Sequence, residues 1–240
     1  MIPKQIHYCW FGQKPFPPSV NNCIESWKRY CSDYDIILHN EDNIDIESHP
    51  YMKEAYDAHK WAFVSDLARL LVIYEHGGIY LDTDVELISQ LDPVLDNKFF
   101  FAIEKDTNIR NGEEYIFVNT GLGFGAEAGN EVVKSLIDEY NGVHFRNNKQ
   151  TYDLTPCPVR NSRAVEKFGW KGKDELMEFM DGTIYPSDYF CPEEFSSDYK
   201  RYTDNTISIH HYDASWKTSR EKMVNQMKTN VKKMLKFLEH

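Results

Sequence analysis

The chain has 240 residues, of which 41% are hydrophobic and 27% are charged, and this balance excludes dominant disorder, collagen-like repeats and coiled coil. The net charge of −11 argues against a protein that binds nucleic acid. No stretch approaches the roughly 18 continuous apolar residues of a membrane-spanning helix, and the first residues lack the apolar stretch of a secretory signal. The five cysteines are scattered without a CxxC pair, which predicts free thiols in a cytoplasmic protein.

The predicted elements alternate between strand and helix, which is typical of an α/β domain. The clearest is a helix over 59–76, because its apolar residues recur at spacings of three and four and Gly77-Gly78 then stops it. In chain order the pattern predicts a strand at 4–10, a helix at 20–30, a strand at 34–38, the helix at 59–76, strands at 79–88, 98–104 and 116–126, a helix at 131–140 and a strand at 207–212.

Two parts of the chain fit this alternation less well. Residues 143–200 are rich in Pro, Asp, Tyr and Ser, and we expect loops there with one short helix near 173–180. Residues 219–240 predict a basic amphipathic helix with Met and Leu on one face. The final three residues, Leu-Glu-His, are typical of a purification-tag remnant, and no function is assigned to them.

Two acidic residues two positions apart end the segment GGIYLDTD at 77–84. On an extended segment such positions face the same side, so Asp82 and Asp84 are predicted to aim at one point. Two carboxylates repel each other there unless a cation lies between them, and a hard divalent ion is the natural occupant. Such an ion neutralises a diphosphate and makes it a better leaving group. A solvated acidic turn is the alternative that this pattern alone leaves open.

A second charged pair lies upstream on the predicted helix. Asp66 and Arg69 are three residues apart and therefore share one face of the helix. A surface ion pair worth under about 1 kcal/mol is the ordinary interpretation. However, apolar residues surround Asp66 at 61–63 and 67–68, and a partly buried charge requires a partner or a ligand. We therefore expect this pair to present a carboxylate and a guanidinium to a sugar or a phosphate.

Taken together, these residues resemble a known family. The pattern Ala62-x-x-Ser65-Asp66-x-x-Arg69 followed by Gly77-Gly78-x-Tyr80-x-Asp82-x-Asp84 is similar to that of glycosyltransferase family 32. That family includes bacterial polysaccharide sugar transferases and yeast mannosyltransferases, and the catalytic domains of the large clostridial glucosylating toxins carry a similar pattern. The opening IHYCWFG resembles the family's first strand, and HHYDASW at 210–216 resembles its C-terminal metal-site motif. The resemblance covers residues 4–218.

This resemblance implies an α/β domain of the GT-A type over residues 1–218, with a central mixed, mostly parallel sheet flanked by helices. It also implies a UDP-sugar donor, a Mn²⁺ or Mg²⁺ ion and retention of the anomeric configuration. Asp82 and Asp84 would hold the metal and the ribose-diphosphate. Asp66 and Arg69, with Ser65 beside them, would grip the donor sugar. Trp10 would stack on the base, and Trp216 would cap the diphosphate or close the site.

The predicted strand at 207–212 contains two histidines, and either could be the metal ligand. Neighbouring side chains on a strand face opposite ways, so only one of His210 and His211 faces a metal directly. Counting back from Trp216 favours His211. Tyr80 alternates with Asp82 and therefore faces the site or packs in the core. Asn119 opens a glycine-rich segment, where it is either a turn residue or a group that positions a substrate.

The expected function is a metal-dependent hexosyltransferase that moves a hexose or N-acetylhexosamine from a UDP-sugar to a saccharide or lipid-linked saccharide in bacterial surface polysaccharide or lipopolysaccharide assembly. Residues 105–116 and 143–200 are expected to be acceptor-side loops. A nucleotide-sugar-binding protein without turnover and a protein-modifying glycosyltransferase are the alternatives. A phosphohydrolase with an aspartate nucleophile is disfavoured, because Glu86 stands where such enzymes place Thr or Val.

The tail leaves two interpretations open. From Trp216 to the end there are seven Lys and Arg against two Glu, which is +5, so the remainder carries −11 − 5 = −16. Such a basic helix is suited to lie at the anionic inner face of the cell membrane, near a lipid-linked acceptor. It is equally suited to pack its apolar face on the domain and expose its lysines.

Overall fold

The structure is a computed structural model that describes residues 1–105, 108–110, 112–147, 151–193 and 200–212. Within these residues a seven-stranded sheet has the order β2-β1-β3-β8-β5-β10-β9. Its strands are β1 (Gln5–Cys9), β2 (Asp35–His39), β3 (Gly78–Tyr80), β5 (Phe99–Ala102), β8 (Phe124–Ala126), β9 (Met177–Phe179) and β10 (Gly182–Tyr185).

The sheet is mixed. β1 pairs in parallel with β2 and β3, and β10 pairs in parallel with β5. β8 is antiparallel to both β3 and β5, and β9 is antiparallel to β10. Among the described strands of this sheet, all but β8 and β9 therefore run in one direction. This confirms the expected α/β fold with a central mixed, mostly parallel sheet.

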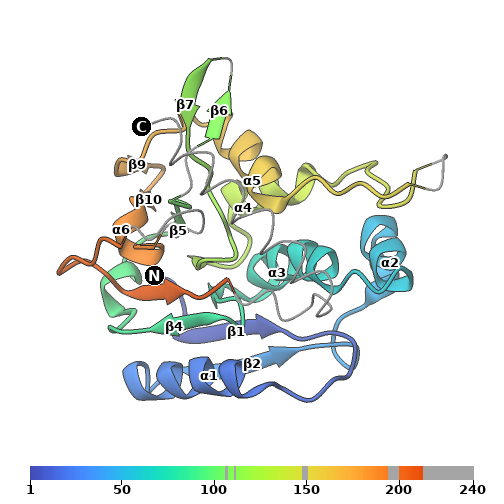
Figure 1. Cartoon of the computed structure of the whole chain (residues 1–240), viewed down its shortest axis with the longest axis horizontal. Coiled ribbons are helices and arrows are strands. Elements are labelled where there is room, and N and C mark those ends of the chain that lie inside the picture. The colour runs from blue at the N-terminus through green and yellow to red at the C-terminus, as the bar shows by residue number, and fades with distance from the viewer. Residues whose placement is uncertain (106–107, 111, 148–150, 194–199, 213–240) are drawn as a thin grey trace, which may run out of the picture.

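Both faces of the sheet are covered. The helices are α1 (Pro18–Tyr30), α2 (Pro50–Asp57), α3 (Trp61–His76), α4 (Glu131–Asp138), α5 (Cys157–Glu166) and α6 (Ser187–Phe190). Phe99 and Phe101 of β5 pack in the cluster with α2 to α5, whereas Phe100 and Ala102 pack in the cluster with α1 and α6. Figure 1 shows α1 and α3 on opposite sides of β1. Burial on both faces explains the uninterrupted apolar run of β5.

Helix α3 and strand β3 position the acidic motif. The helix buries one apolar side, including Val64, Leu67 and Leu70. It ends at Gly77, whose φ of 73° requires glycine and whose N–H donates to the Ile73 carbonyl. β3 starts at the next residue. The expected helix at 59–76 is thus confirmed apart from its first two residues, and its Asp66–Arg69 turn lies beside the end of β3.

Smaller elements complete the described chain. β4 (Val85–Leu87) pairs antiparallel with β11 (Ser208–His210), and this ribbon lies against α1. β6 (Asn108–Arg110) and β7 (Glu113–Tyr115) form a hairpin at the top of Figure 1. Two short 3-10 helices cover Ile46–Ser48 and Asp92–Val94. Among the described residues, no helix combines the length and apolar character needed to cross a bilayer.

The region expected to be irregular contains regular structure. The short helix expected near 173–180 is wrong, because 177–179 forms β9 and pairs with β10. β10 in turn pairs with the distant β5, and this long-range pairing overrides local propensity. Helix α5 was also not predicted, although Pro158 near its start is a helix-initiating signal. The predicted tail helix at 219–240 lies outside the described residues.

Candidate active site

The two aspartates of the acidic motif lie where β3 ends. Asp82 follows the strand by two residues, and its N–H donates to the Gly121 carbonyl at 3.2 Å. Asp84 lies in the turn before β4, and its carbonyl accepts a hydrogen bond from the His211 N–H at 2.9 Å. These backbone bonds tie the motif to two segments far away in the chain, so its geometry depends on the whole domain.

Arg69 is buried between two carboxylates. Its side chain is only 2% exposed, its Nη1 donates to Asp82 Oδ1 at 3.1 Å, and its Nη2 forms an ion pair with Asp66. The Tyr80 hydroxyl donates to the same Asp82 oxygen at 2.9 Å. Burial raises the pKa of Asp82, and the Arg69 charge opposes that rise. The guanidinium therefore holds Asp82 in place and compensates its charge.

His210 joins the two aspartates from β11. Its Nε2 lies 3.2 Å from Asp84 Oδ1, and the side chain is 9% exposed. Burial lowers the pKa of His210, but the charges of Asp84 and Asp82 and the bond to Asp84 outweigh this, so the pKa is raised. One ligand atom from each of Asp82, Asp84 and His210 lies within 4.8 Å of the other two. This is a compact set of two carboxylates and one imidazole.

This set fits a divalent cation. Its negative charge exceeds what one imidazolium balances, and its oxygen and nitrogen donors are those that Mn²⁺ and similar ions accept. The buried His210 Nδ1 has no hydrogen-bond partner among the described residues. A ligating histidine normally donates from its other nitrogen, so water or a residue outside the described part has to meet that atom.

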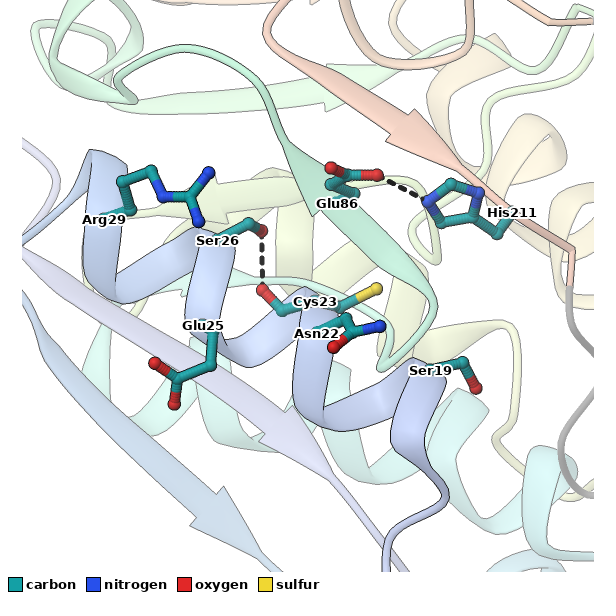
Figure 2. A pocket seen from close by; sticks show the side chains of 8 residues that line it. All are labelled: Ser19, Asn22, Cys23, Glu25, Ser26, Arg29, Glu86 and His211. Atoms are coloured by element: carbon teal, nitrogen blue, oxygen red, sulfur yellow. Dashed lines mark hydrogen bonds and ion pairs between the residues drawn. The ribbon is translucent and has the colours of Figure 1, made fainter.

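The preference for His211 over His210 is corrected. In the register of β11 with β4, Ile209 pairs with Glu86 and His210 pairs with Val85. Alternation then turns His211 to the side of Glu86, where its Nε2 lies 2.8 Å from Glu86 Oε2. Figure 2 shows this pair in a pocket beside α1. The pocket is lined by Ser19, Asn22, Cys23, Glu25, Ser26, Arg29, Glu86 and His211.

The loop residues 119–121 lie beside Asp82, and we call them the Asn119–Gly121 shelf. Asn119 Oδ1 accepts a hydrogen bond from the Gly121 N–H at 2.8 Å. A Cβ on Gly121 would lie 2.3 Å from Asp82 Oδ2 and 3.3 Å from Arg69 Nη1, so a larger residue would displace the Asp82 carboxylate. Cys157, at the start of α5, accepts from Arg69 Nη2 at 3.0 Å. Asn119 lies beside the aspartates, and its role in donor binding stays a prediction. Gly121 and Cys157 were not predicted, although GLGFG was a visible signal for the glycine.

The remaining predicted residues have other neighbours or lie outside the described residues. Trp10 follows β1, is half-buried, donates from Nε1 to the Lys14 carbonyl at 2.6 Å and contacts Phe16 edge-on. Ser65 is half-buried beside Asp66 on α3. Trp216 lies outside the described residues. The roles of these three in donor binding stay predictions.

Comparison with known proteins addresses the chemistry. A family model described as "Glycosyltransferase sugar-binding region containing DXD motif" matches residues 17–101. That span contains Asp66, Arg69, Asp82 and Asp84, which the structure brings together. This chain is a DXD-containing glycosyltransferase. Its α/β architecture agrees with the GT-A type that the resemblance implied.

Relatives of this glycosyltransferase include an uncharacterized glycosyltransferase of Acanthamoeba polyphaga mimivirus, 29% identical over 68% of this chain and 76% of the viral protein. Inositol phosphoceramide mannosyltransferase 3 of Schizosaccharomyces pombe is 30% identical over 39% of this chain but only 27% of its own length. The solved PaToxG glycosyltransferase has 16% identity over 70% of both chains. Its TM-score is 0.48. Glycosyltransferases of the matched family take a nucleotide-sugar donor and a saccharide acceptor, and DXD-containing enzymes generally use a divalent metal.

Proposed function

We propose that this glycosyltransferase is metal-dependent and retaining, and that it moves a hexose or N-acetylhexosamine from a UDP-sugar to a saccharide hydroxyl. The observation that carries the proposal is the cluster of Asp82, Asp84 and His210 beside the buried Arg69. The setting, bacterial surface polysaccharide or lipopolysaccharide assembly, follows from the bacterial members of the family that the sequence resembles.

The residues present would hold Mn²⁺ or Mg²⁺ through the Asp82 and Asp84 carboxylates and His210. When bound, such an ion supplies positive charge that neutralises the diphosphate and eases its departure. The imidazole favours Mn²⁺ over Mg²⁺, because Mg²⁺ prefers oxygen ligands alone.

The protein's own groups provide orientation. Arg69 and Tyr80 both bind Asp82, so this carboxylate is fixed before any substrate arrives. A preorganised site of this kind does not have to reorganise as the reaction proceeds, which is a large part of electrostatic catalysis. Gly121 lets Asp82 Oδ2 lie close against the backbone, where a Cβ would intrude.

Retention does not require a nucleophile from the protein. In a same-face displacement, the bond from the anomeric carbon to the phosphate oxygen breaks, and its electron pair leaves with the diphosphate. The acceptor oxygen bonds to the anomeric carbon on the same face, and its proton passes to the departing phosphate oxygen. The protein contributes by holding donor and acceptor in this geometry.

We also propose where in the cell the reaction takes place. We infer a cytoplasmic enzyme that contacts the inner face of the membrane through its basic tail and meets a lipid-linked saccharide there. The excess of Lys and Arg after Trp216 supports this, because each basic residue near an anionic surface contributes about 1 kcal/mol of attraction.

The test is release of the nucleoside diphosphate, with and without Mn²⁺: UDP from a panel of UDP-sugars and GDP from GDP-mannose. Asp84→Asn is compared with Glu86→Gln, which removes a carboxylate from the same ribbon on the side away from the cluster. We expect slow donor hydrolysis that requires metal, is lost in Asp84→Asn and persists in Glu86→Gln. Nucleotide binding without turnover, even with saccharide acceptors supplied, would favour a binding protein. Turnover without metal would overturn the metal-dependent proposal.

A further inference from the structure

The strand order reverses at β1, which places the segment after this strand at the edge where ligands bind. From β1 the chain passes through α1 to β2 on one side, and it returns through α2 and α3 to β3 on the other side. The helices α1 and α3 lie on opposite sides of β1 (Figure 1). Ligands of open α/β sheets bind at such a reversal, outside the carboxyl ends of the strands. Trp10 follows β1 at this edge, on the strand next to the one that leads into Asp82.

Residues 10–12, which we call the Trp10 loop, are hydrogen-bonded to the turn after β2. The Trp10 N–H donates to the His39 carbonyl at 2.9 Å, which continues the parallel pairing of β1 with β2. Two residues later, the Gly12 N–H donates to Glu41 Oε1 at 2.7 Å. A backbone N–H that is partly removed from water requires such an acceptor. The turn after β2 therefore holds the Trp10 loop at both of its ends.

The Glu41 carboxylate is itself held in place. The Tyr56 hydroxyl on α2 donates to the same Glu41 oxygen at 3.2 Å, and the Glu41 side chain is half-buried. The turn that carries Glu41 is closed by its neighbours, since the Asn40 N–H donates to Asn43 Oδ1 and the Asp42 N–H donates to Asn40 Oδ1, both at 2.9 Å. Asparagine side chains close turns in this way. Glu41 thus presents a fixed acceptor to the Trp10 loop.

Gly12 lets the Trp10 loop lie against the start of α3. Its φ of 88° is a left-handed conformation that glycine adopts readily, and a Cβ there would lie 2.7 Å from Trp61 Cε2. The Trp61 ring also contacts the Tyr56 ring edge-on, with the ring centroids 5.1 Å apart. Because Tyr56 binds Glu41, the three side chains of Glu41, Tyr56 and Trp61 form one connected support for the loop.

The loop turns its two aromatic residues to different sides of the sheet. Phe11 is buried in the cluster with α2 to α5, whereas Trp10 packs against the cluster with α1 and is half-buried. The Trp10 ring contacts Phe16 edge-on. An aromatic ring that keeps part of its surface exposed is suited to stack on a nucleobase, and stacking requires a defined ring orientation. The backbone of the Trp10 loop sets that orientation.

We infer that Glu41 is a positioning residue that fixes the Trp10 loop in the conformation that receives the nucleobase of the donor. This inference rests on the proposed function, in which the donor is a nucleotide sugar. Glu41 acts through the Gly12 N–H and does not have to touch the base. Because that N–H needs only an acceptor oxygen, the amide oxygen of a glutamine can replace the carboxylate.

The experiment measures the affinities for UDP and GDP in the presence of Mn²⁺ by isothermal titration calorimetry, and the variants are then compared with the nucleotide that the wild type binds. Glu41→Gln retains an acceptor oxygen and Glu41→Ala removes it. Trp10→Ala and the double variant of Glu41→Ala with Trp10→Ala complete a cycle. The control is Glu47→Ala, which removes an exposed carboxylate from the same connection between β2 and α2.

We expect Glu41→Ala and Trp10→Ala each to weaken nucleotide binding by about 5-fold or more, because each disturbs the surface that meets the base. Glu41→Gln and Glu47→Ala should change it by less than about 2-fold. The double variant should lose little more than Trp10→Ala alone, because both substitutions act on one loop. Binding of Mn²⁺ without nucleotide, followed by electron paramagnetic resonance, should stay unchanged in Glu41→Ala.

The opposite results would overturn the inference. Equal losses in Glu41→Gln and Glu41→Ala would mean that the charge itself meets the ligand, and losses that multiply in the double variant would mean that Glu41 acts independently of Trp10. Normal nucleotide binding in either Glu41→Ala or Trp10→Ala, or a parallel loss of Mn²⁺ binding in Glu41→Ala, would equally exclude this positioning role.

Gly12→Ala tests the same loop without changing Glu41, in case Glu41→Ala does not fold. Its added methyl group would press against Trp61, so it should also weaken nucleotide binding by about 5-fold or more. Normal binding in Gly12→Ala would contradict the inference. If the wild type binds neither UDP nor GDP, the proposed function itself fails, and this is evident before any variant is compared.

Discussion

Arg69 Nη1 lies 3.1 Å from Asp82 Oδ1, so the buried guanidinium of α3 and the first carboxylate of the DXD motif form one ion pair. The pair joins two sequence motifs that stand on consecutive elements. Through this contact Arg69 positions the Asp82 carboxylate of the DXD motif. Because Asp66 binds the same guanidinium, one cation serves two carboxylates that would otherwise repel each other.

Replacing Arg69 should therefore destabilise the domain as well as the site. Breaking a buried ion pair by removing one partner costs about 3–5 kcal/mol, because the remaining charge is left without compensation. We expect Arg69→Gln to lower the free energy of unfolding by that amount in urea denaturation. The control is Lys98→Gln, which removes an exposed ion pair with Asp181 and should cost under about 1 kcal/mol. Equal effects of the two variants would contradict a buried, charge-compensating role for Arg69.

Filling the space at Gly121 should block the site without unfolding the protein. The added methyl group of Gly121→Ala would stand 2.3 Å from Asp82 Oδ2 and would displace that carboxylate. We expect Mn²⁺-dependent UDP binding to weaken by roughly 10-fold or more, which corresponds to about 1.4 kcal/mol. Gly129→Asn is the control, since no atom lies within 4 Å of that position and Asn tolerates its φ of 72°. Normal UDP binding by Gly121→Ala would show that the shelf is not part of the donor site.

The two histidines of β11 should behave differently. His210→Ala removes an imidazole that lies 3.2 Å from Asp84, whereas His211→Ala removes one that binds Glu86 on the other side of the ribbon. We expect His210→Ala to weaken Mn²⁺ binding, followed by electron paramagnetic resonance, by roughly 10-fold or more. His211→Ala should bind Mn²⁺ like the wild type. The reverse result would restore the preference for His211 that the sequence suggested.

Acid should destabilise the protein through a buried histidine pair. His7 Nδ1 and His39 Nε2 lie 2.9 Å apart, and burial lowers the pKa of His7 to about 3 and that of His39 to about 4. The unfolded histidines take up protons near the ordinary value of 6.5, so the unfolded state binds more protons below that pH. Stability from this pair is therefore complete above about pH 6.5. It is lost as the pH falls toward 4, by up to about 1.4 kcal/mol per pH unit for each histidine.

This pH dependence can be measured by urea denaturation between pH 7.5 and 4.5. His39→Gln should reduce the slope of the free energy of unfolding against pH, because it removes one of the two buried groups that must stay neutral. A slope unaffected by His39→Gln would mean that other groups cause any acid sensitivity.

Much of the fold and part of the site could be predicted from local patterns. The spacing of apolar residues and the glycine stop identified α3, and the three-residue spacing of Asp66 and Arg69 predicted that they share a face. The DXD spacing predicted that Asp82 and Asp84 converge, which they do. These features depend on neighbours within about one helical turn or one strand repeat, so the sequence contains them directly.

Only the tertiary structure decided which distant residues complete the site. The register of β11 against β4 turned His210 to the aspartates, although counting along the sequence favoured His211. The insertion of β8 between β3 and β5 brought Gly121 against Asp82 and aligned Asn119 with Glu104. Pairing between strands far apart in the chain sets these contacts, and a shift of one residue in register would reverse the faces. The sequence by itself therefore determined the chemistry of the motif, while strand order and register determined its surroundings.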